Sequence, residues 1–101
     1  LVQIFVDGVR TELFADTGAL SGSFISTAAA VSMGISINRT SPPNIKLEDG
    51  SIVTSTGRTS SVSLQSATRA ISTTFIVMDT LIHDIILGWH DIRNLRLLTW
   101  Q

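Results

Sequence analysis

Short runs of alternating hydrophobic and polar residues, separated by turn residues, recur along the whole chain. A period of two is the pattern of half-buried β-strands, and no stretch keeps the 3.6-residue period of a long amphipathic helix. Together the runs predict about seven or eight short strands and one or two short helices, in a mostly β, closed or half-closed barrel. The segments expected to be strands are 2–6, 9–15, 24–25, 45–47, 52–56, 61–64, 71–78, 85–87 and 96–100.

Turn and cap residues divide these runs. Asp7-Gly8 predicts a tight hairpin turn, because glycine adopts a positive φ without penalty. Ser26 is expected to cap a short helix that continues through Met33 and stops at Gly34. A second short helix is expected at residues 90–95.

The composition excludes several classes of protein. The 101 residues allow one domain, which we expect to span residues 1–101. The net charge of −1 gives no footprint for nucleic acid, and no apolar run approaches the roughly 18 residues that cross a membrane. The absence of cysteine excludes disulfides and thiolate metal sites. Only 15% of residues are charged, so part of the apolar surplus is expected in a subunit interface.

One acidic turn stands out as candidate chemistry. Asp16-Thr17-Gly18 comes directly after an apolar strand end, and Phe24-Ile25 follows it closely. About seventy residues later comes Ile85–Leu87, an apolar run closed by Gly88 and followed by a short helix. The tripeptide alone is also compatible with an ordinary turn in which the aspartate bonds to backbone amides.

Taken together, these stretches resemble the retropepsins, the aspartic proteases of retroviruses and retrotransposons and their cellular relatives. The matching residues are Phe14-Ala15-Asp16-Thr17-Gly18-Ala19, Ser23-Phe24-Ile25-Ser26 and Asp84-Ile85-Ile86-Leu87-Gly88, of which the last two look most like Ty3/gypsy-type retrotransposon proteases. The resemblance implies a retropepsin-like acid-protease barrel with one half-site per chain. It also implies a homodimeric endopeptidase whose substrates are extended peptides, such as junctions of a polyprotein.

The chemistry agrees with this interpretation. Aspartic proteolysis needs two facing carboxyl groups that share one proton. The chain carries a single Asp-Thr-Gly, so a complete site requires two chains, each contributing Asp16. Thr17 is expected to bond the opposite loop, and Gly18 to allow close approach of backbone and substrate. No cofactor and no metal are expected.

The resemblance also implies a substrate-binding region. The hairpin at residues 45–56 corresponds to the family's flap, with its tip near Glu48 to Ser51. Residues 85–88 are expected to pass behind the Asp16 loop as a strand buried on both faces, and residues 2–5 and 97–100 to supply strands of the dimer sheet. The candidate substrate contacts are Ala19, Leu20, Leu47, Glu48, Asp49, Gly50, Ser51, Ile52, Leu81 and Ile82, with Val53 as a further pocket wall.

Some positions depart from the family pattern. Retroviral members usually carry an ion pair near the interface, where this chain has Leu20 and Trp89. Retrotransposon relatives commonly have an aspartate where this chain has His90. The dipeptides His83-Asp84 and His90-Asp91 are expected to be solvated loop and helix residues rather than metal ligands.

Two other classes of function stay open. The chain could be a catalytically silent retropepsin-like domain that dimerises or binds peptide, although an intact Asp16 favours the enzyme. A β-barrel binding domain unrelated to proteases would require the three matching motifs to be coincidental. The sequence does not assign a compartment; a retroelement origin would imply the cytoplasm or a particle.

Overall fold

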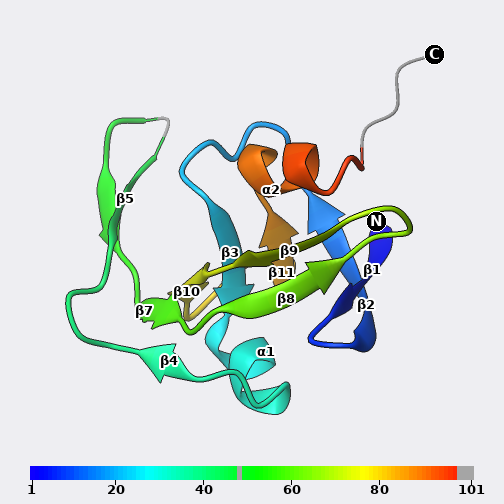
Figure 1. Cartoon of the computed structure of the whole chain (residues 1–101). Helices are drawn as coiled ribbons and strands as arrows, with labels where there is room; N and C mark the ends of the chain where they lie inside the picture. Colours follow the sequence, from blue (N-terminus) through cyan, green and yellow to red (C-terminus); the bar gives the residue numbers. More distant parts are fainter. Residues whose placement is uncertain (48, 98–101) are drawn as a thin grey trace.

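The computed structural model describes residues 1–47 and 49–97. Figure 1 shows short strands wrapped around one core, with two short helices at opposite ends. The strands are β1 (Val2–Val6), β2 (Val9–Ala15), β3 (Ser23–Ser26), β4 (Ile37–Asn38), β5 (Asn44–Lys46), β6 (Ile52–Thr54), β7 (Gly57–Thr59), β8 (Val62–Gln65), β9 (Ala70–Thr73), β10 (Phe75–Met78) and β11 (Ile85–Leu87). The helices are α1 (Thr27–Ser32) and α2 (Trp89–Asn94).

Nine strands form one sheet, in the order β4-β7-β10-β3-β11-β2-β1-β8-β9. Two neighbouring pairs, β10 with β3 and β11 with β2, are parallel, and the other pairs are antiparallel. β5 and β6 form a separate hairpin that stands beside this sheet (Figure 1). The parallel pairing of β11 with β2 places the ends of these two strands next to each other, which positions the candidate site.

The β1–β2 hairpin forms as its sequence predicts. Asp7 and Gly8 have φ values of 48° and 81°, so both central residues of the turn are in the left-handed region that a two-residue hairpin requires. The Asp7 side chain accepts a hydrogen bond from the Ser63 backbone N–H at 2.8 Å, and the Asp7 N–H donates to the Ser63 carbonyl. The turn therefore also fixes the start of β8.

The core is built from alternate residues of strands that lie in different parts of the curled sheet. Ile4 and Val6 from β1, Val62 and Leu64 from β8, and Ile25, Phe75 and Leu87 from the central strands are all buried in one cluster. Because β8 and β9 fold across β3 and β11 (Figure 1), the sheet packs against itself and encloses these side chains.

Both helices are short, and a side chain caps α1 but not α2. The Ser26 hydroxyl accepts a hydrogen bond from the Ala29 N–H at 3.0 Å, which confirms the expected N-cap, and Gly34 follows α1 with a φ of 70°. α2 begins one residue earlier than expected and ends one residue earlier. Within residues 1–47 and 49–97, neither helix has the length or apolar character to cross a membrane.

Several strand predictions are wrong in detail. Residues 71–78 form two strands, because the chain leaves β8 after Thr73 and joins β3 and β7 from Phe75. The Phe75 N–H bonds the Thr59 hydroxyl at 2.8 Å at this change of partner. The short strands β4 and β7 were not predicted, since two or three residues are too few to show a period.

Two further expectations concerned terminal strands. β1 lies between β2 and β8, but only Phe5 and Val6 pair on both sides; residues 2–4 pair with β2 alone, so their part in a dimer sheet stays a prediction. Arg96 and Leu97 do not continue as a strand: Arg96 has a φ of 54°, and the Leu97 N–H bonds the Ile92 carbonyl in the turn that ends α2. The rest of that predicted strand, residues 98–100, lies outside the described residues.

Asp79, which follows β10, is bonded to the start of α1 and to the residue before β7. Its carboxylate accepts hydrogen bonds from the hydroxyls of Thr27, the first residue of α1, and Thr56, which precedes β7, both at 2.8 Å. The bond from Thr56, followed by that from Thr27, lowers the pKa of Asp79 below its usual value. The ionised side chain therefore stabilises the attachment of the hairpin to the body of the domain.

We expect Asp79→Asn to lower the melting temperature at neutral pH. Because folding lowers the pKa of Asp79, its contribution is complete above the pKa of the unfolded chain, about 3.9, and is lost as the pH falls through the folded value. The difference between wild type and variant should therefore be constant above about pH 5 and close below pH 4. Glu12→Gln is the control, since Glu12 is exposed on β2. A difference that does not change with pH would contradict this role of the carboxylate.

Candidate active site

The loop that carries Asp16 is held by backbone hydrogen bonds at both ends. The Asp16 N–H donates to the Leu87 carbonyl at 2.9 Å, and the Trp89 N–H donates to the Ala19 carbonyl at 2.9 Å. Inside the loop, the Ala19 N–H bonds the Asp16 carbonyl, and the Gly18 N–H bonds Oδ1 of the Asp16 carboxylate at 2.9 Å. The carboxylate is thus oriented by its own turn, and the turn is fixed by the junction between β11 and α2.

Gly88 allows this junction to approach the loop. A Cβ atom at residue 88 would lie 2.2 Å from the Gly22 carbonyl oxygen and 2.8 Å from the Ala19 carbonyl oxygen. No side chain fits at those distances, so the close approach requires glycine. The Gly88 N–H donates to the Ser23 hydroxyl at 2.9 Å, which ties the junction to the start of β3.

The junction between β11 and α2 is also stabilised by a buried carboxylate, that of Asp91. Asp91 on α2 is 6% exposed, and its Oδ2 accepts hydrogen bonds from the Ser23 hydroxyl at 2.5 Å and the Thr73 hydroxyl at 3.0 Å. Since Ser23 also accepts the Gly88 N–H, the three polar groups form one continuous network. A buried carboxylate is stable only when such donors replace its water.

The Asp16 side chain opens into an apolar recess of about 190 Å³. The recess lies where the loop after β2, the hairpin β5–β6 and the segment after β10 come together. It is lined by Asp16, Ala19, Phe24, Ile45, Leu47, Met78, Leu81 and Ile86. Asp16 is the one ionisable group among these eight side chains, so the recess combines an acid with apolar walls.

The segments that line the recess also expose large apolar side chains. Leu20, Ile52 and Ile82 are 78%, 67% and 94% exposed, and they belong to the same three segments that line the recess. At the hairpin tip, the Asp49 carboxylate accepts hydrogen bonds from the hydroxyl and the N–H of Ser51, and these bonds lower the pKa of Asp49. Gly50 has a φ of 88°, as a tight tip requires.

Four of the residues predicted for the site line the recess: Asp16, Ala19, Leu47 and Leu81. The other described candidates do not line the recess. Val53 is half-buried, and the exposed ones on the neighbouring segments are Leu20, Asp49, Gly50, Ser51, Ile52 and Ile82. Thr17 and Gly18 are exposed at the head of the turn. Glu48 lies outside the described residues.

Four lining residues were not predicted: Phe24, Ile45, Met78 and Ile86. Ile86 also corrects the expectation that residues 85–88 are buried on both faces. Ile85 and Leu87 point into the core, whereas Ile86 faces the recess beside its Cα partner Phe24. The period of two along β11 could have shown that one side chain points away from its neighbours.

The two His-Asp dipeptides were expected to be solvated, but only His90 and Asp84 are exposed. Asp91 is buried, as described above, and His83 is half-buried with its ring stacked on Phe14. His90 and Asp84 are exposed; the Asp84 carboxylate accepts a hydrogen bond from Ser26 at 3.0 Å. Among the described residues, no group of three or more His, Asp or Glu side chains converges on a possible metal position.

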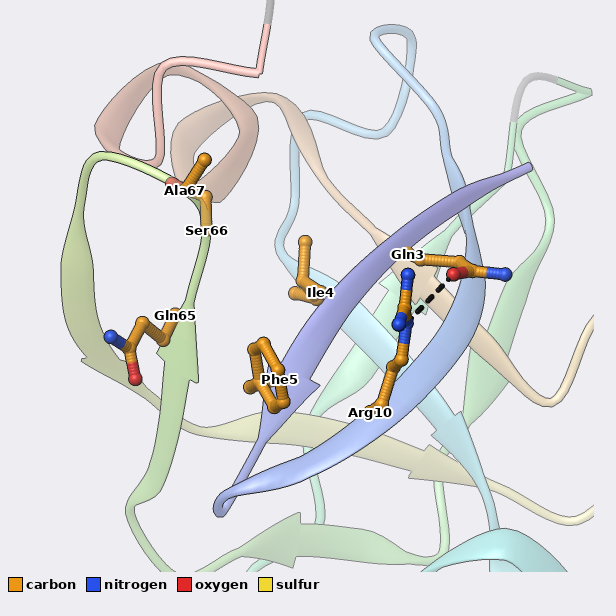
Figure 2. Close-up of a pocket in the computed structure, with 7 residues that line it drawn as sticks. All are labelled: Gln3, Ile4, Phe5, Arg10, Gln65, Ser66 and Ala67. Atoms are coloured by element: carbon orange, nitrogen blue, oxygen red, sulfur yellow. Dashed lines mark hydrogen bonds between the residues drawn. The ribbon is translucent and has the colours of Figure 1, made fainter.

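A larger recess, of about 410 Å³, shares no residue with the Asp16 recess. It lies where β1 separates from β8, because Ser66 turns away to bond the Arg69 and Leu95 carbonyls. Figure 2 shows Arg10 and Gln3 together on one side of the lining, where the Arg10 side chain donates to the Gln3 side chain at 3.0 Å. Its lining contains no carboxylate, so it offers no acid–base chemistry.

Gly88→Ala should loosen the Asp16 loop. The new Cβ cannot lie 2.2 Å from the Gly22 oxygen, so the backbone must shift, at a cost of about 1–3 kcal/mol in the free energy of unfolding. We expect amide exchange at Asp16 and Trp89 to accelerate by about tenfold or more, since their bonds span this contact. Gly34→Ala is the control for a general loss of stability: its φ of 70° strains an alanine, but its added Cβ meets no atom within 4 Å. Equal exchange in both variants would show that the contact does not hold the loop.

Comparison with known proteins agrees with this geometry. Among solved structures, the EIAV protease complexed with the inhibitor HBY-793 has a TM-score of 0.75 at 21% sequence identity, covering 99% of this chain and 90% of that chain. The retroviral protease-like domain of Ddi1 from Leishmania major has a TM-score of 0.65 at 19% identity, covering 91% of this chain and 70% of that chain. These likenesses confirm the predicted mostly β, retropepsin-like fold.

The sequence itself carries the family assignment. No curated protein sequence matches this chain. A family model described as Aspartyl protease matches residues 2–90, which is most of the chain. The chain therefore belongs to the aspartyl protease family.

Proposed function

We propose that the protein is an aspartic endopeptidase that acts as a homodimer and cleaves extended peptides. The catalytic groups are Asp16, Thr17 and Gly18 of each chain. The observation that carries the proposal is the Asp16 carboxylate, oriented by the Gly18 N–H and open to an apolar recess. The family assignment supports the same chemistry.

The need for two chains follows from the chemistry of the site. One chain has one Asp-Thr-Gly, and Asp16 is the single acid of its recess. Two carboxyls are needed, one to remove a proton from water and one to protonate the peptide carbonyl. In the proposed dimer, a two-fold axis places the Asp16 of the second chain opposite that of the first. The exposed Thr17 side chains are available to bond the opposite loop.

The two Asp16 carboxyls would share one proton, because like charges a few ångströms apart cannot both be present. The ionised carboxyl removes a proton from a bound water, whose oxygen attacks the scissile carbonyl carbon, while the other donates its proton to the carbonyl oxygen. In the resulting diol the C–N bond breaks, and its electron pair and a proton from the dyad go to nitrogen. One hydroxyl proton then returns to the dyad.

The walls of the site suit peptide rather than a charged ligand. The lining apart from Asp16 is apolar, and the segments that carry it expose Leu20, Ile52 and Ile82. An extended peptide would lie across the recess with alternate side chains directed into it. We propose that the β5–β6 hairpin closes over it as a flap, with contacts from Leu47 to Ile52. Junctions of a polyprotein are the substrates that the family resemblance favours.

Asp16→Asn should abolish cleavage. Loss of the shared proton and the general base is expected to lower kcat/KM by at least about 10²–10⁴-fold, measured with a peptide library at pH 4 to 7. Asp7→Asn is the matched control: Asp7 also lies in a turn that contains a glycine, but in the β1–β2 turn, and asparagine keeps the acceptor for Ser63. Cleavage that survives Asp16→Asn would contradict the proposed chemistry.

Dilution tests the dimer separately. Specific activity should fall as the protein is diluted below its dimer dissociation constant, because a monomer has half a site. Sedimentation at the same concentrations should show dissociation over the same range. Cleavage by a species that sediments as a monomer would contradict the shared site. A stable dimer that cleaves no peptide would instead support the silent, peptide-binding alternative.

A further inference from the structure

The recess between β1 and β8 is not used by the proposed chemistry. Its volume of about 410 Å³ lies in the range of small-molecule sites, and it shares no residue with the Asp16 recess. The turn between β8 and β9 forms one of its walls, and there the Ser66 hydroxyl donates to the Leu95 carbonyl at 3.0 Å. That wall is therefore held in place without a ligand.

Arg10 supplies the one charge in the lining of this recess. Its Nε–H donates to the Gln3 carboxamide at 3.0 Å, which fixes the guanidinium group on one side of the recess (Figure 2). In the described part of the chain, neither Nη group of Arg10 has a hydrogen-bond partner. Glu12, the Cα partner of Gln3, shares this face of the sheet but does not line the recess. The guanidinium group is thus available to bind a carboxylate through two parallel hydrogen bonds.

The Phe5 ring lies between the polar sides of the recess. Phe5 is the Cα partner of both Arg10 on β2 and Gln65 on β8, so the three side chains form a row on one face of the sheet. Figure 2 shows the ring between Arg10 and Gln65. The Phe5 side chain is 44% exposed. It therefore offers a surface on which the ring of a ligand can pack.

Backbone groups of Gln3 face the same space. Along an antiparallel strand, the N–H and C=O groups of successive residues alternate between the two neighbouring strands. The Asp7 N–H donates to the Ser63 carbonyl of β8, so the alternation directs the groups of Phe5 and Gln3 to that side as well. Phe5 is paired with β8, but at Gln3 the chain after Gln65 has already turned away. The Gln3 N–H is therefore a further donor toward the recess.

We propose that this recess binds a small aromatic carboxylate. The carboxylate bonds the Arg10 guanidinium group, the ring packs on Phe5, and the Gln65 carboxamide and the Gln3 N–H are the remaining donors. A cationic ligand is disfavoured, because Arg10 repels it and the lining has no acid to offset the charge. The inference does not depend on the proposed function, since none of these groups belongs to the Asp16 recess.

An NMR titration of the wild-type chain with phenylpropionate tests the site. We expect saturable shifts at the backbone amides of Gln3, Phe5 and Gln65, with a Kd in the millimolar range or tighter for a ligand of this size. Phenylpropionamide has the same ring without the charge. It should bind at least about tenfold more weakly, because a charged hydrogen-bonded pair is lost.

Three variants assign the two halves of the ligand to their partners. Arg10→Gln should weaken phenylpropionate binding at least about tenfold, and Arg10→Lys, which keeps the charge but not the planar donors, about two- to tenfold. Phe5→Leu should also weaken it about two- to tenfold. Arg93→Gln, at an exposed position on α2, is the matched control and should bind as wild type does. Arg10 and Phe5 are exposed, so the variants should melt within a few degrees of wild type.

The other outcomes overturn the inference. Equal affinities for the acid and the amide, or an unchanged affinity in Arg10→Gln, mean that Arg10 recognises no carboxylate. Shifts that centre on Asp16 and Leu81 place the ligand in the other recess. If a glutamate-containing extended peptide shifts the Gln3 and Gln65 amides and phenylpropionate does not, the recess is a peptide-docking surface rather than a site for a small acid.

Discussion

Backbone hydrogen bonds from the β11–α2 junction hold both ends of the loop that carries Asp16. The bonds from Asp16 N–H to Leu87 and from Trp89 N–H to Ala19 are possible only because Gly88 leaves room for the Gly22 and Ala19 carbonyls. The parallel pairing of β2 with β11 brings these segments together across about seventy residues of sequence. The Asp16 carboxylate is thus oriented by its own turn, and the turn is positioned by the topology of the sheet.

The same junction explains a polar group that would otherwise be costly. Burial disfavours the charge of the Asp91 carboxylate, but two hydroxyl groups donate hydrogen bonds to it. One of them, from Ser23, also accepts the Gly88 N–H. Above this network the side chains alternate: Ile85 and Leu87 enter the core, and Ile86 faces the recess. One short strand therefore supports the core, the loop and the recess at once.

The sequence predicted the fold class, the β1–β2 turn and the Ser26 cap, because these depend on neighbours within a few residues. It did not predict the break at Thr74, since β-propensity is continuous there and the change of partner is tertiary. For the site, Asp16, Ala19, Leu47 and Leu81 were among the predicted residues, whereas Phe24, Ile45, Met78 and Ile86 were assigned to strands without a part in the site. Which face of an all-apolar strand turns outward depends on its neighbours. The burial of Asp91 and the stack of His83 likewise depend on contacts with distant strands.

The most direct test is a crystal structure of the chain with a non-cleavable peptide analogue, which shows whether the Asp16 loops of two chains form one shared site. The expected result is two copies related by a two-fold axis, with their Asp16 carboxyls about 3 Å apart and the peptide extended between them and the β5–β6 hairpins. Asp16 side chains that lie far apart in every assembly, or a peptide bound away from the recess, would contradict it.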